Sequence, residues 1–419
     1  MRKALSLLVL LLAGAACHDA PASRSDYLFV WAGDSAEKSS DFLAVIDANP
    51  TSVTYGSVIA SAPTGAVGTH PHHTEAELSP NGHLLANGFH TGQTWLFDLT
   101  TPRAPKILTT FGDLAGYSHP HTYVRLSNGN VLATFQYKSD SAAPAPSMHM
   151  GGGAKPANVE HLTGGLVEMD EKGTVVRSGS AADAAIADRR VFPYSVLEMP
   201  AIDRAVSTTT DMDQGDTKAT SQWVQFWRRS DLTLLNSIAL PPGPRGDENQ
   251  LTGEPHLLPD GKSVYIHTFS CGLYLVRSIE TPTPTSTFVH GFPGKYCGVP
   301  LLAGKFWLQT VESTHSLVAL DVSDAEHPVE VSSVKFGDGE APHWISMDRT
   351  GKRIVLNSGG YSTSNRLYII NFDPASGHLA LDDKFHDAGS TVAGINFSQR
   401  AWPHGWTGTA APHGTVFSH

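Results

Sequence analysis

The stretch PHHTEAELSPNGHLLANGF (71–89), followed by TWLFDLTTPRAPKIL (94–108), decides the fold of this chain. Short apolar runs alternate in it with turn sequences, in the order strand, turn, strand, then strand, turn, strand. Alternation of apolar and polar residues is typical of β-strands, and Asn-Gly or Pro-containing breaks are typical of the turns between them. The stretch therefore predicts a unit of four consecutive strands.

Five further stretches begin the same unit elsewhere in the chain. Four of them start with Pro followed by His or Tyr, and one starts with Gly-Val-Pro: PHTYVRLSNGNVLATFQ (120–136), PYSVLEMPAIDRAVSTTT (193–210), PHLLPDGKSVYIHTFS (255–270), GVPLLAGKFWLQTV (298–311) and PHWISMDRTGKRIVLNSG (342–359). Repetition of a four-stranded unit is the sequence signature of a propeller blade.

The two ends of the chain supply the parts of a seventh unit. YLFVWAG (27–33), DFLAVIDAN (41–49) and TYGSVIAS (54–61) match the second, third and fourth strands, and WPHGWTG (402–408) can supply the first. Pairing of the chain ends removes an exposed sheet edge. We therefore predict an all-β fold, a seven-bladed β-propeller closed by pairing N- and C-terminal segments, as one domain over residues 27–419 with an insert at 138–163.

The N-terminus MRKALSLLVLLLAGAACHDA (1–20) combines two positive charges, an apolar run and small residues before Cys17. This pattern predicts a signal peptide over residues 1–17 with a bacterial lipobox, followed by a linker over 18–26. The apolar run is too short to remain as a membrane span. We expect a periplasmic or outer-membrane-anchored lipoprotein that touches the membrane only through a lipid on Cys17. Ordinary cleavage without lipidation is the alternative.

The formal net charge of −11 disfavours partners that are themselves anionic. Nucleic acid and anionic membrane surfaces attract basic patches, so neither is an expected partner. In an oxidising compartment, Cys271 and Cys297 can form a disulfide, and two buried thiols or a thiolate ligand are the alternatives.

The propeller prediction brings distant histidines to one place. The first strand of a blade lines the central channel and starts at one face, so the blade-start residues converge there: His72 or His73, His121, Tyr194, His256, Cys297-Gly298, His343 and His404. Loops between second and third strands reach the same face and add His90, Met148, His149, Met150 and His267. We expect His413 and His419 to lie in a terminal tail.

Neutral imidazoles that converge on a small volume suit a borderline transition metal. The predicted ligands are the histidines at the blade starts: His72, His73, His121, His256, His343 and His404. Copper is the expected metal and zinc the alternative. A hydrolase with a metal-activated water would favour carboxylate ligands, which the blade starts do not offer.

Three further residues are candidates for catalysis. Glu254 in GEPH and Glu340 in GEAPH each precede a blade-start histidine, so either can orient a ligand or accept a proton. Tyr194 replaces histidine at the third blade start, where it can donate a hydrogen bond near the site or fill the channel.

SDFLAVIDANPTSVTYGSVIASAP (40–63) resembles the opening motif of the selenium-binding protein family, which includes the methanethiol oxidases. The doublet His72-His73 and the later segments follow in the family's order: RAPKIL (103–108), GGLVEMDEKG (164–173), LVALDVSDAEHPVEV (317–331) and RTGKRIVLNS (349–358). Here Tyr55 is followed by Gly56, where the family has a cysteine, and the C-terminal sequence also departs from the family's ending. Selenium binding through that thiol is therefore not expected.

The resemblance implies a seven-bladed propeller and a copper-dependent oxidation. In the oxidase members a small thiol, methanethiol, reacts with oxygen and water to give formaldehyde, hydrogen sulfide and hydrogen peroxide. The family's histidines carry over onto the blade starts at His73, His121, His256, His343 and His404. The alternative function is a non-catalytic periplasmic propeller that binds metal or presents a protein-interaction face.

Overall fold

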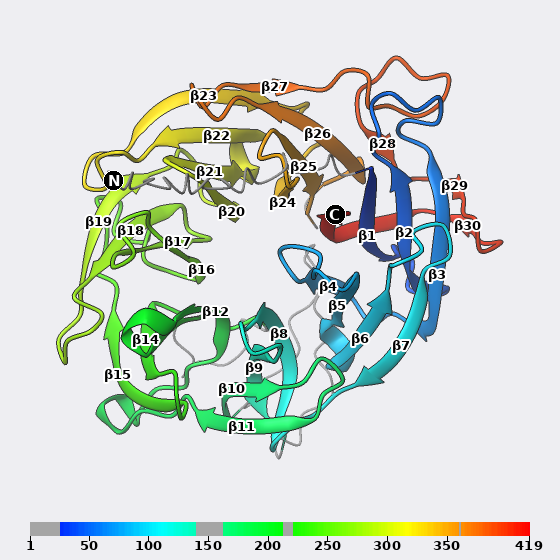
Figure 1. The fold of residues 1–419 in the computed structure, drawn as a ribbon. Coiled ribbons are helices and arrows are strands. Elements are labelled where there is room, and N and C mark those ends of the chain that lie inside the picture. Colours follow the sequence, from blue (N-terminus) through cyan, green and yellow to red (C-terminus); the bar gives the residue numbers. More distant parts are fainter. Residues whose placement is uncertain (1–25, 140–161, 213–220, 360–361) are drawn as a thin grey trace, which may run out of the picture.

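Seven antiparallel sheets form a closed ring in the computed structural model, which describes residues 26–139, 162–212, 221–359 and 362–419 (Figure 1). Each sheet has four strands along its main path, and its first strand lies at the centre of the ring. The predicted seven-bladed β-propeller is therefore confirmed. No helix in the described part of the chain is long and apolar enough to cross a membrane.

Six blades follow the repeat units found in the sequence. Blades 1 to 3 consist of β4 (Pro71–Thr74), β5 (His83–Gly88), β6 (Gln93–Asp98) and β7 (Lys106–Phe111); β8 (Tyr117–Arg125), β9 (Val131–Lys138), β10 (Thr163–Met169) and β11 (Val175–Ser180); and β12 (Pro193–Met199), β13 (Arg204–Thr209), β14 (Trp223–Arg228) and β15 (Thr233–Ala239). Short 3-10 turns connect some strands: η1 (Phe89–Thr91), η2 (Ala184–Ile186), η3 (Pro200–Ile202) and η4 (Glu312–Thr314).

Blades 4 to 6 repeat the same order from the centre outward. They consist of β16 (Thr252–Leu257), β17 (Val264–Thr268), β18 (Gly272–Arg277) and β19 (Thr285–Gly291); β20 (Cys297–Ala303), β21 (Phe306–Val311), β22 (Ser316–Asp321) and β23 (Val329–Lys335); and β24 (Pro342–Met347), β25 (Arg353–Ser358), β26 (Arg366–Phe372) and β27 (Leu379–Leu381), with β28 (Ile395–Asn396) also paired to β26.

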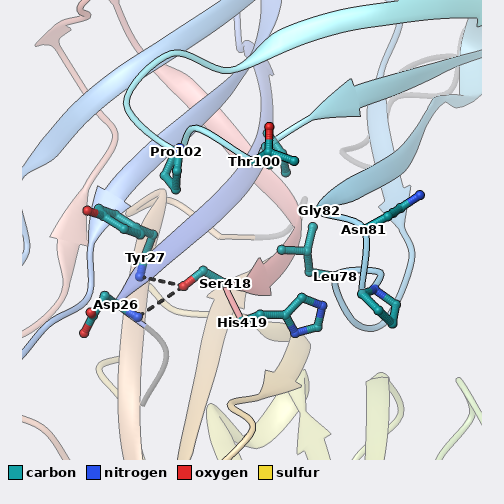
Figure 2. A pocket seen from close by; sticks show the side chains of 11 residues that line it. Asp26, Tyr27, Leu78, Asn81, Gly82, Thr100, Pro102, Ser418 and His419 are labelled. Carbon is teal, nitrogen blue, oxygen red and sulfur yellow. Dashed lines mark hydrogen bonds between the residues drawn. The ribbon is translucent and has the colours of Figure 1, made fainter. Parts of the chain in front are cut away.

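The seventh blade joins the two ends of the chain. Its strands, from the centre outward, are β31 (Ala410–Phe417), β1 (Tyr27–Asp34), β2 (Ser40–Asp47) and β3 (Val58–Val67). β31 pairs antiparallel with β1, with Phe29 opposite Val416. Just beyond β31, the Ser418 hydroxyl accepts hydrogen bonds from the backbone N–H groups of Asp26 and Tyr27, each at 3.1 Å (Figure 2).

The closing strand is not the one predicted from the sequence. WPHGWTG (402–408) forms the small hairpin of β29 (Arg400–Ala401) and β30 (Thr407–Gly408), whose Trp402 ring packs on Phe42. The innermost strand is β31, which carries its own Pro412-His413. β31 closes the ring because Val416 and Phe417, on opposite faces of the strand, fill the cores toward the two neighbouring blades.

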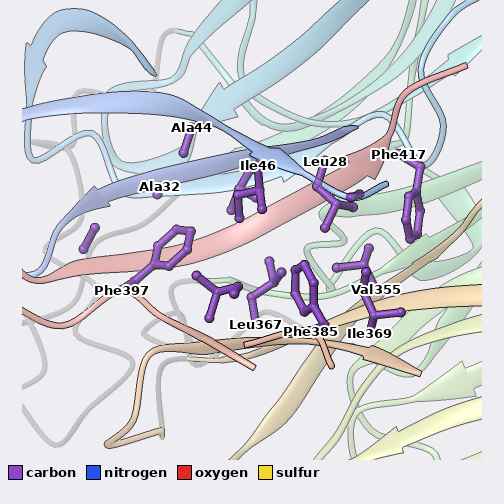
Figure 3. Packing of buried hydrophobic residues seen from close by; sticks show 14 of the residues in the cluster. Leu28, Ala32, Ala44, Ile46, Val355, Leu367, Ile369, Phe385, Phe397 and Phe417 are labelled. Carbon is purple, nitrogen blue, oxygen red and sulfur yellow. The ribbon is translucent and has the colours of Figure 1, made fainter. Parts of the chain in front are cut away.

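The core lies between neighbouring blades, and both faces of most sheets are buried. Along β1, Leu28 and Val30 pack toward blade 6, whereas Phe29 and Trp31 pack toward blade 1. Figure 3 shows the first of these layers, where Leu28 and Phe417 meet Val355 and Leu367 of blade 6. Because successive side chains point to opposite faces, a strand between two blades needs a continuous apolar run, which YLFVWAG provides.

A disulfide links blade 4 to blade 5. Cys271, between β17 and β18, is bonded to Cys297 at the start of β20, and both side chains are fully buried. Of the alternatives that the sequence left open, the structure therefore has the disulfide. The predicted signal peptide and lipobox lie outside the described residues, as do residues 140–161 of the predicted insert between β9 and β10, with Met148, His149 and Met150.

Loss of the disulfide is expected to lower the free energy of unfolding. Its two cysteines are 26 residues apart, and a closed loop of that size stabilises a fold by about 3 kcal/mol. The variant Cys271→Ala/Cys297→Ala should therefore unfold at a clearly lower denaturant concentration than the oxidised protein. Dithiothreitol should shift the midpoint of the wild type but not that of the variant. A shift in both, or in neither, would contradict a stabilising role for this bond.

Candidate metal centre

A β-bulge at the start of each innermost strand positions the side chains of the site. The register shifts between Pro71 and Thr74 in β4 and between Pro120 and Tyr123 in β8, and the other innermost strands have a shift at the equivalent place. Proline cannot donate a ladder hydrogen bond, so it favours such an irregularity. A bulge re-aims the side chains beside it. In β4, β8, β24 and β31 the Pro-His dipeptide lies at this bulge and thus places its histidine at the channel, whereas in β16 it follows the bulge.

Five of these histidines form one group, which we call the histidine cluster. Its members come from four innermost strands, β4, β8, β24 and β31: His72, His73, His121, His343 and His413. The distance between ring centroids is 4.2 Å for His73 and His121, 4.4 Å for His72 and His413, and 4.9 Å for His343 and His413. Residues up to 341 positions apart in sequence therefore share one small volume.

His72, His73 and His121 form the tightest part of the cluster. One ring nitrogen of each lies within 4.8 Å of the others, and Nε2 of His72 is 3.0 Å from Nε2 of His121. All three side chains are buried. Among the described residues, this is the one group of histidines, cysteines and carboxylates with the spacing needed to hold a metal ion.

Burial keeps four of the five imidazoles of the cluster neutral: His72, His73, His121 and His413. It lowers the pKa of His72, His73 and His413 well below 6.5, and the neighbouring histidines lower it further because they carry the same charge when protonated. Burial likewise lowers the pKa of His121, to about 4. A neutral imidazole keeps a lone pair on one nitrogen, which is the form that binds a transition metal.

Tyr194 orients two of the three histidines. Its backbone carbonyl oxygen lies 2.9 Å from Nδ1 of His121. A carbonyl only accepts, so Nδ1 carries the hydrogen and the Nε2 lone pair points into the cluster. The Tyr194 hydroxyl lies 3.3 Å from Nε2 of His73, and its ring packs on His121 at 4.1 Å. The structure thus places Tyr194 beside the three histidines.

Glu312 orients His343. Its Oε1 lies 2.6 Å from Nδ1 of His343, whose Nε2 is buried and has no hydrogen-bond partner. Burial alone would lower the pKa of His343, but the Glu312 carboxylate raises it above its usual value. A histidine that donates one N–H to a carboxylate and presents its other nitrogen to a small volume is the usual arrangement of a metal ligand.

Glu254 lies close to Tyr194. Its Oε2 is 2.6 Å from Nε2 of His267, and this pairing lowers the pKa of Glu254 despite its burial, so the group is a carboxylate at neutral pH. Burial and the Glu254 carboxylate raise the pKa of the Tyr194 hydroxyl well above 10. Glu254, Tyr194 and His73 therefore form a polar chain that ends at the three histidines.

The structure does not bring every predicted residue to the cluster. His256 contacts Trp307, with ring centroids 5.2 Å apart, and burial lowers its pKa to about 4. Glu340 accepts hydrogen bonds from Ser358 at 2.6 Å and Tyr368 at 2.7 Å, within blade 6.

His404 also lies away from the channel, because its segment forms the β29–β30 hairpin. Its Nδ1 lies 2.7 Å from the Ser61 hydroxyl, and its ring packs on Phe42. The blade-start position expected for His404 is occupied by His413, which is not in a tail. Of the histidines expected from the loops, His90 is buried against the ring of His70, and His267 pairs with Glu254.

Two residues of the candidate site were missed from the sequence, His413 and Glu312. His413 stands in a Pro-His dipeptide like the others, so the repeat itself carried the signal. Glu312 directly follows the second strand of blade 5, at the place where Phe89 follows β5 in blade 1, next to His90. The rule that loops between second and third strands reach the cluster face would have found it.

A separate pocket lies away from the cluster, past the far end of β31. It is lined by residues of the closing blade and of two turns in blade 1, among them Tyr27, Asn81, Thr100 and His419 (Figure 2). None of the predicted site residues lines it. The cluster is therefore the candidate functional site.

Comparisons with known proteins point to a limited relationship. No protein-family model matches the chain. A methanethiol oxidase from Hyphomicrobium sp is 33% identical over 112 residues, which span 25% of this chain and 24% of that protein. The match therefore covers about a quarter of the relative, and the relative's activity does not transfer to this chain by similarity alone.

Two solved structures share the fold over nearly the whole chain. A hypothetical selenium-binding protein from Sulfolobus tokodaii is 16% identical with a TM-score of 0.71, covering 95% of this chain and 94% of that one. A periplasmic gluconolactonase from Pseudomonas aeruginosa is 13% identical with a TM-score of 0.61, covering 94% and 99%. At these identities the likeness shows the propeller fold alone.

The metal-free protein is expected to lose stability as the pH falls from about 6.5 to about 4. Over this range the unfolded chain protonates His121, whereas the folded protein, in which its pKa is about 4, does not. Near pH 5 this single group should make the unfolding free energy fall by about 1 kcal/mol per pH unit. Denaturant midpoints of the chelator-treated protein between pH 7 and pH 5 measure this slope.

The variant His121→Gln should have a shallower slope, and His327→Gln, at a largely exposed histidine, serves as the matched control. Equal slopes in the two variants would show that His121 is not held neutral by burial.

Proposed function

We propose that this protein is a metal-dependent oxidase of a small thiol, similar in reaction to a methanethiol oxidase, with copper as the metal. The observation that carries the proposal is the group of three buried, neutral imidazoles, His72, His73 and His121, with ligand atoms within 4.8 Å of one another. The partial match to a methanethiol oxidase supports the same reaction class.

The donor set fits a borderline transition metal. All the donor atoms are imidazole nitrogens. These bind copper and zinc better than magnesium or calcium, which prefer oxygen ligands. His72, His73 and His121 would hold the ion, and His343 and His413 lie beside them as further donors. Bound copper supplies a soft Lewis acid that favours the thiolate form of the substrate, together with a one-electron redox couple.

The reaction that we propose for methanethiol balances with two co-substrates. Methanethiol, dioxygen and water give formaldehyde, hydrogen sulfide and hydrogen peroxide: the carbon is oxidised by two electrons, dioxygen is reduced by two, and water supplies the carbonyl oxygen. The reaction requires protons to leave the thiol and the methyl group. A base within the buried site is therefore needed.

Glu254 is the base that the site offers. Its carboxylate is held by His267 at 2.6 Å, with Tyr194 between it and His73. Tyr194 orients His121 through its backbone and faces His73 through its hydroxyl, so it positions ligands and also links them to Glu254. His343 of the cluster and Glu312 form a second histidine–carboxylate pair.

A non-catalytic propeller that stores metal or binds a partner protein is the alternative. Zinc bound by the same nitrogens would suit this non-catalytic role, because zinc has no redox chemistry. Export to the periplasm, with or without a lipid on Cys17, is part of either proposal and rests on the N-terminal sequence.

The first test is the metal content of the mature protein, expressed with export and offered copper. We expect about one copper per chain, with peroxide and sulfide formed from methanethiol in equal amounts. The variant His121→Ala/His343→Ala should lose the metal and the activity, because it removes donors from two blades. The matched control is His404→Ala, which removes a histidine outside the cluster and should keep both. Copper-free protein that oxidises thiols at the wild-type rate would overturn the proposal.

The role of Glu254 has its own test. Glu254→Gln should lower kcat by about 100-fold or more, the usual effect of removing a general base, while the copper content stays near that of the wild type. Glu340→Gln is the matched control, because Glu340 is a buried carboxylate bonded within blade 6. Similar losses of kcat in both variants would contradict the assignment of Glu254.

A further inference from the structure

Phe269 differs from the other aromatic side chains around the histidine cluster. Phe89, Tyr194 and Trp344 contact cluster histidines and are buried, whereas Phe269 is only half-buried. Its ring lies 5.4 Å from the ring of Tyr194 and 6.3 Å from that of His343. An apolar face therefore remains accessible next to the imidazoles.

The backbone of Phe269 is held on both sides. Its N–H donates to the carbonyl oxygen of Leu251 at 2.8 Å, and its own carbonyl oxygen accepts from the N–H of Cys297 at 3.0 Å. Two residues further on, Cys271 is bonded to Cys297. The ring thus stands on a segment that two backbone hydrogen bonds and a disulfide fix against blade 5.

The Phe269 ring also lies next to a polar pair of the site. The imidazole of His267, which holds the Glu254 carboxylate, lies 5.2 Å from it. Phe269 therefore stands between the two histidine–carboxylate pairs, His267 with Glu254 and His343 with Glu312. Its ring is a partly exposed apolar surface beside buried imidazoles and carboxylates.

We propose that Phe269 is a specificity-determining residue, which packs against the alkyl group of a thiol held at the histidine cluster and limits its length. The inference rests on the proposed function. The sulfur faces the imidazoles and the alkyl chain faces the ring, so short unbranched alkyl thiols are the substrate class. Thiols that carry a carboxylate are disfavoured, because the acidic side chains of Glu254 and Glu312 lie on both sides.

The test is calorimetric binding of methanethiol, propanethiol and hexanethiol to the copper-loaded protein without oxygen. In the wild type, the affinity should be highest for a thiol with a short alkyl chain and lower for longer chains. Phe269→Ala should shift the preference toward hexanethiol by about 10-fold or more, the discrimination that a methylene or two gives in an apolar pocket. Phe269→Leu, which keeps an apolar side chain, should give an intermediate preference. Phe111→Ala, which removes a ring from the outer strand β7, is the matched control and should leave the preference unchanged.

The outcomes separate this inference from the proposed function. Thiols that bind the wild type, with the same chain-length preference in Phe269→Ala, would overturn the role of Phe269 and leave the oxidase proposal intact. A wild type that holds copper but binds none of the three thiols would overturn the proposed function and this inference with it.

Discussion

The pairing of β31 with β1 is the constraint on which the rest of the structure depends. It closes the ring, so no sheet edge is left open, and it completes the two apolar layers on either side of the seventh blade. The same strand carries His413 into the channel, where it packs against His72 and His343. Because the channel is formed only when all seven innermost strands are in place, closing the ring and assembling the site are one event.

Proline next to histidine places the imidazoles of the histidine cluster inside that ring. The ladder of backbone hydrogen bonds is interrupted near the start of each innermost strand. In four of these strands the interruption falls on a Pro-His dipeptide, whose histidine enters the cluster or its neighbourhood. Such an interruption costs some strand pairing, and the rigid apolar layers between the blades compensate for it. The same layers hold the imidazoles close together without a hydrogen-bonded partner for every nitrogen, as with Nε2 of His343.

Electrostatics divide the site into a neutral centre and two charged flanks. His72, His73 and His121 stay neutral because burial disfavours their protonation, and repulsion from neighbouring imidazoles adds to this for His72 and His73. Two histidine–carboxylate pairs lie close to them, Glu254 with His267 and Glu312 with His343. A neutral centre keeps imidazole lone pairs free inside one buried volume, and ionised carboxylates lie close by without belonging to the group of three histidines.

The sequence by itself determined the all-β class, the seven four-stranded units, their order and the place where histidines gather, because the period of two and the Pro-His repeat are local properties of the chain. It also marked Tyr194 and Glu254 as neighbours of the ligands. Only the tertiary structure decided that β31 rather than residues 402–408 closes the ring, that His413 rather than His404 enters the channel, and that Glu312 rather than Glu340 meets His343. Two Pro-His segments near the C-terminus are nearly equivalent locally, and the choice between them depends on which one fills both neighbouring cores. That is a property of packing between blades, which no single segment contains.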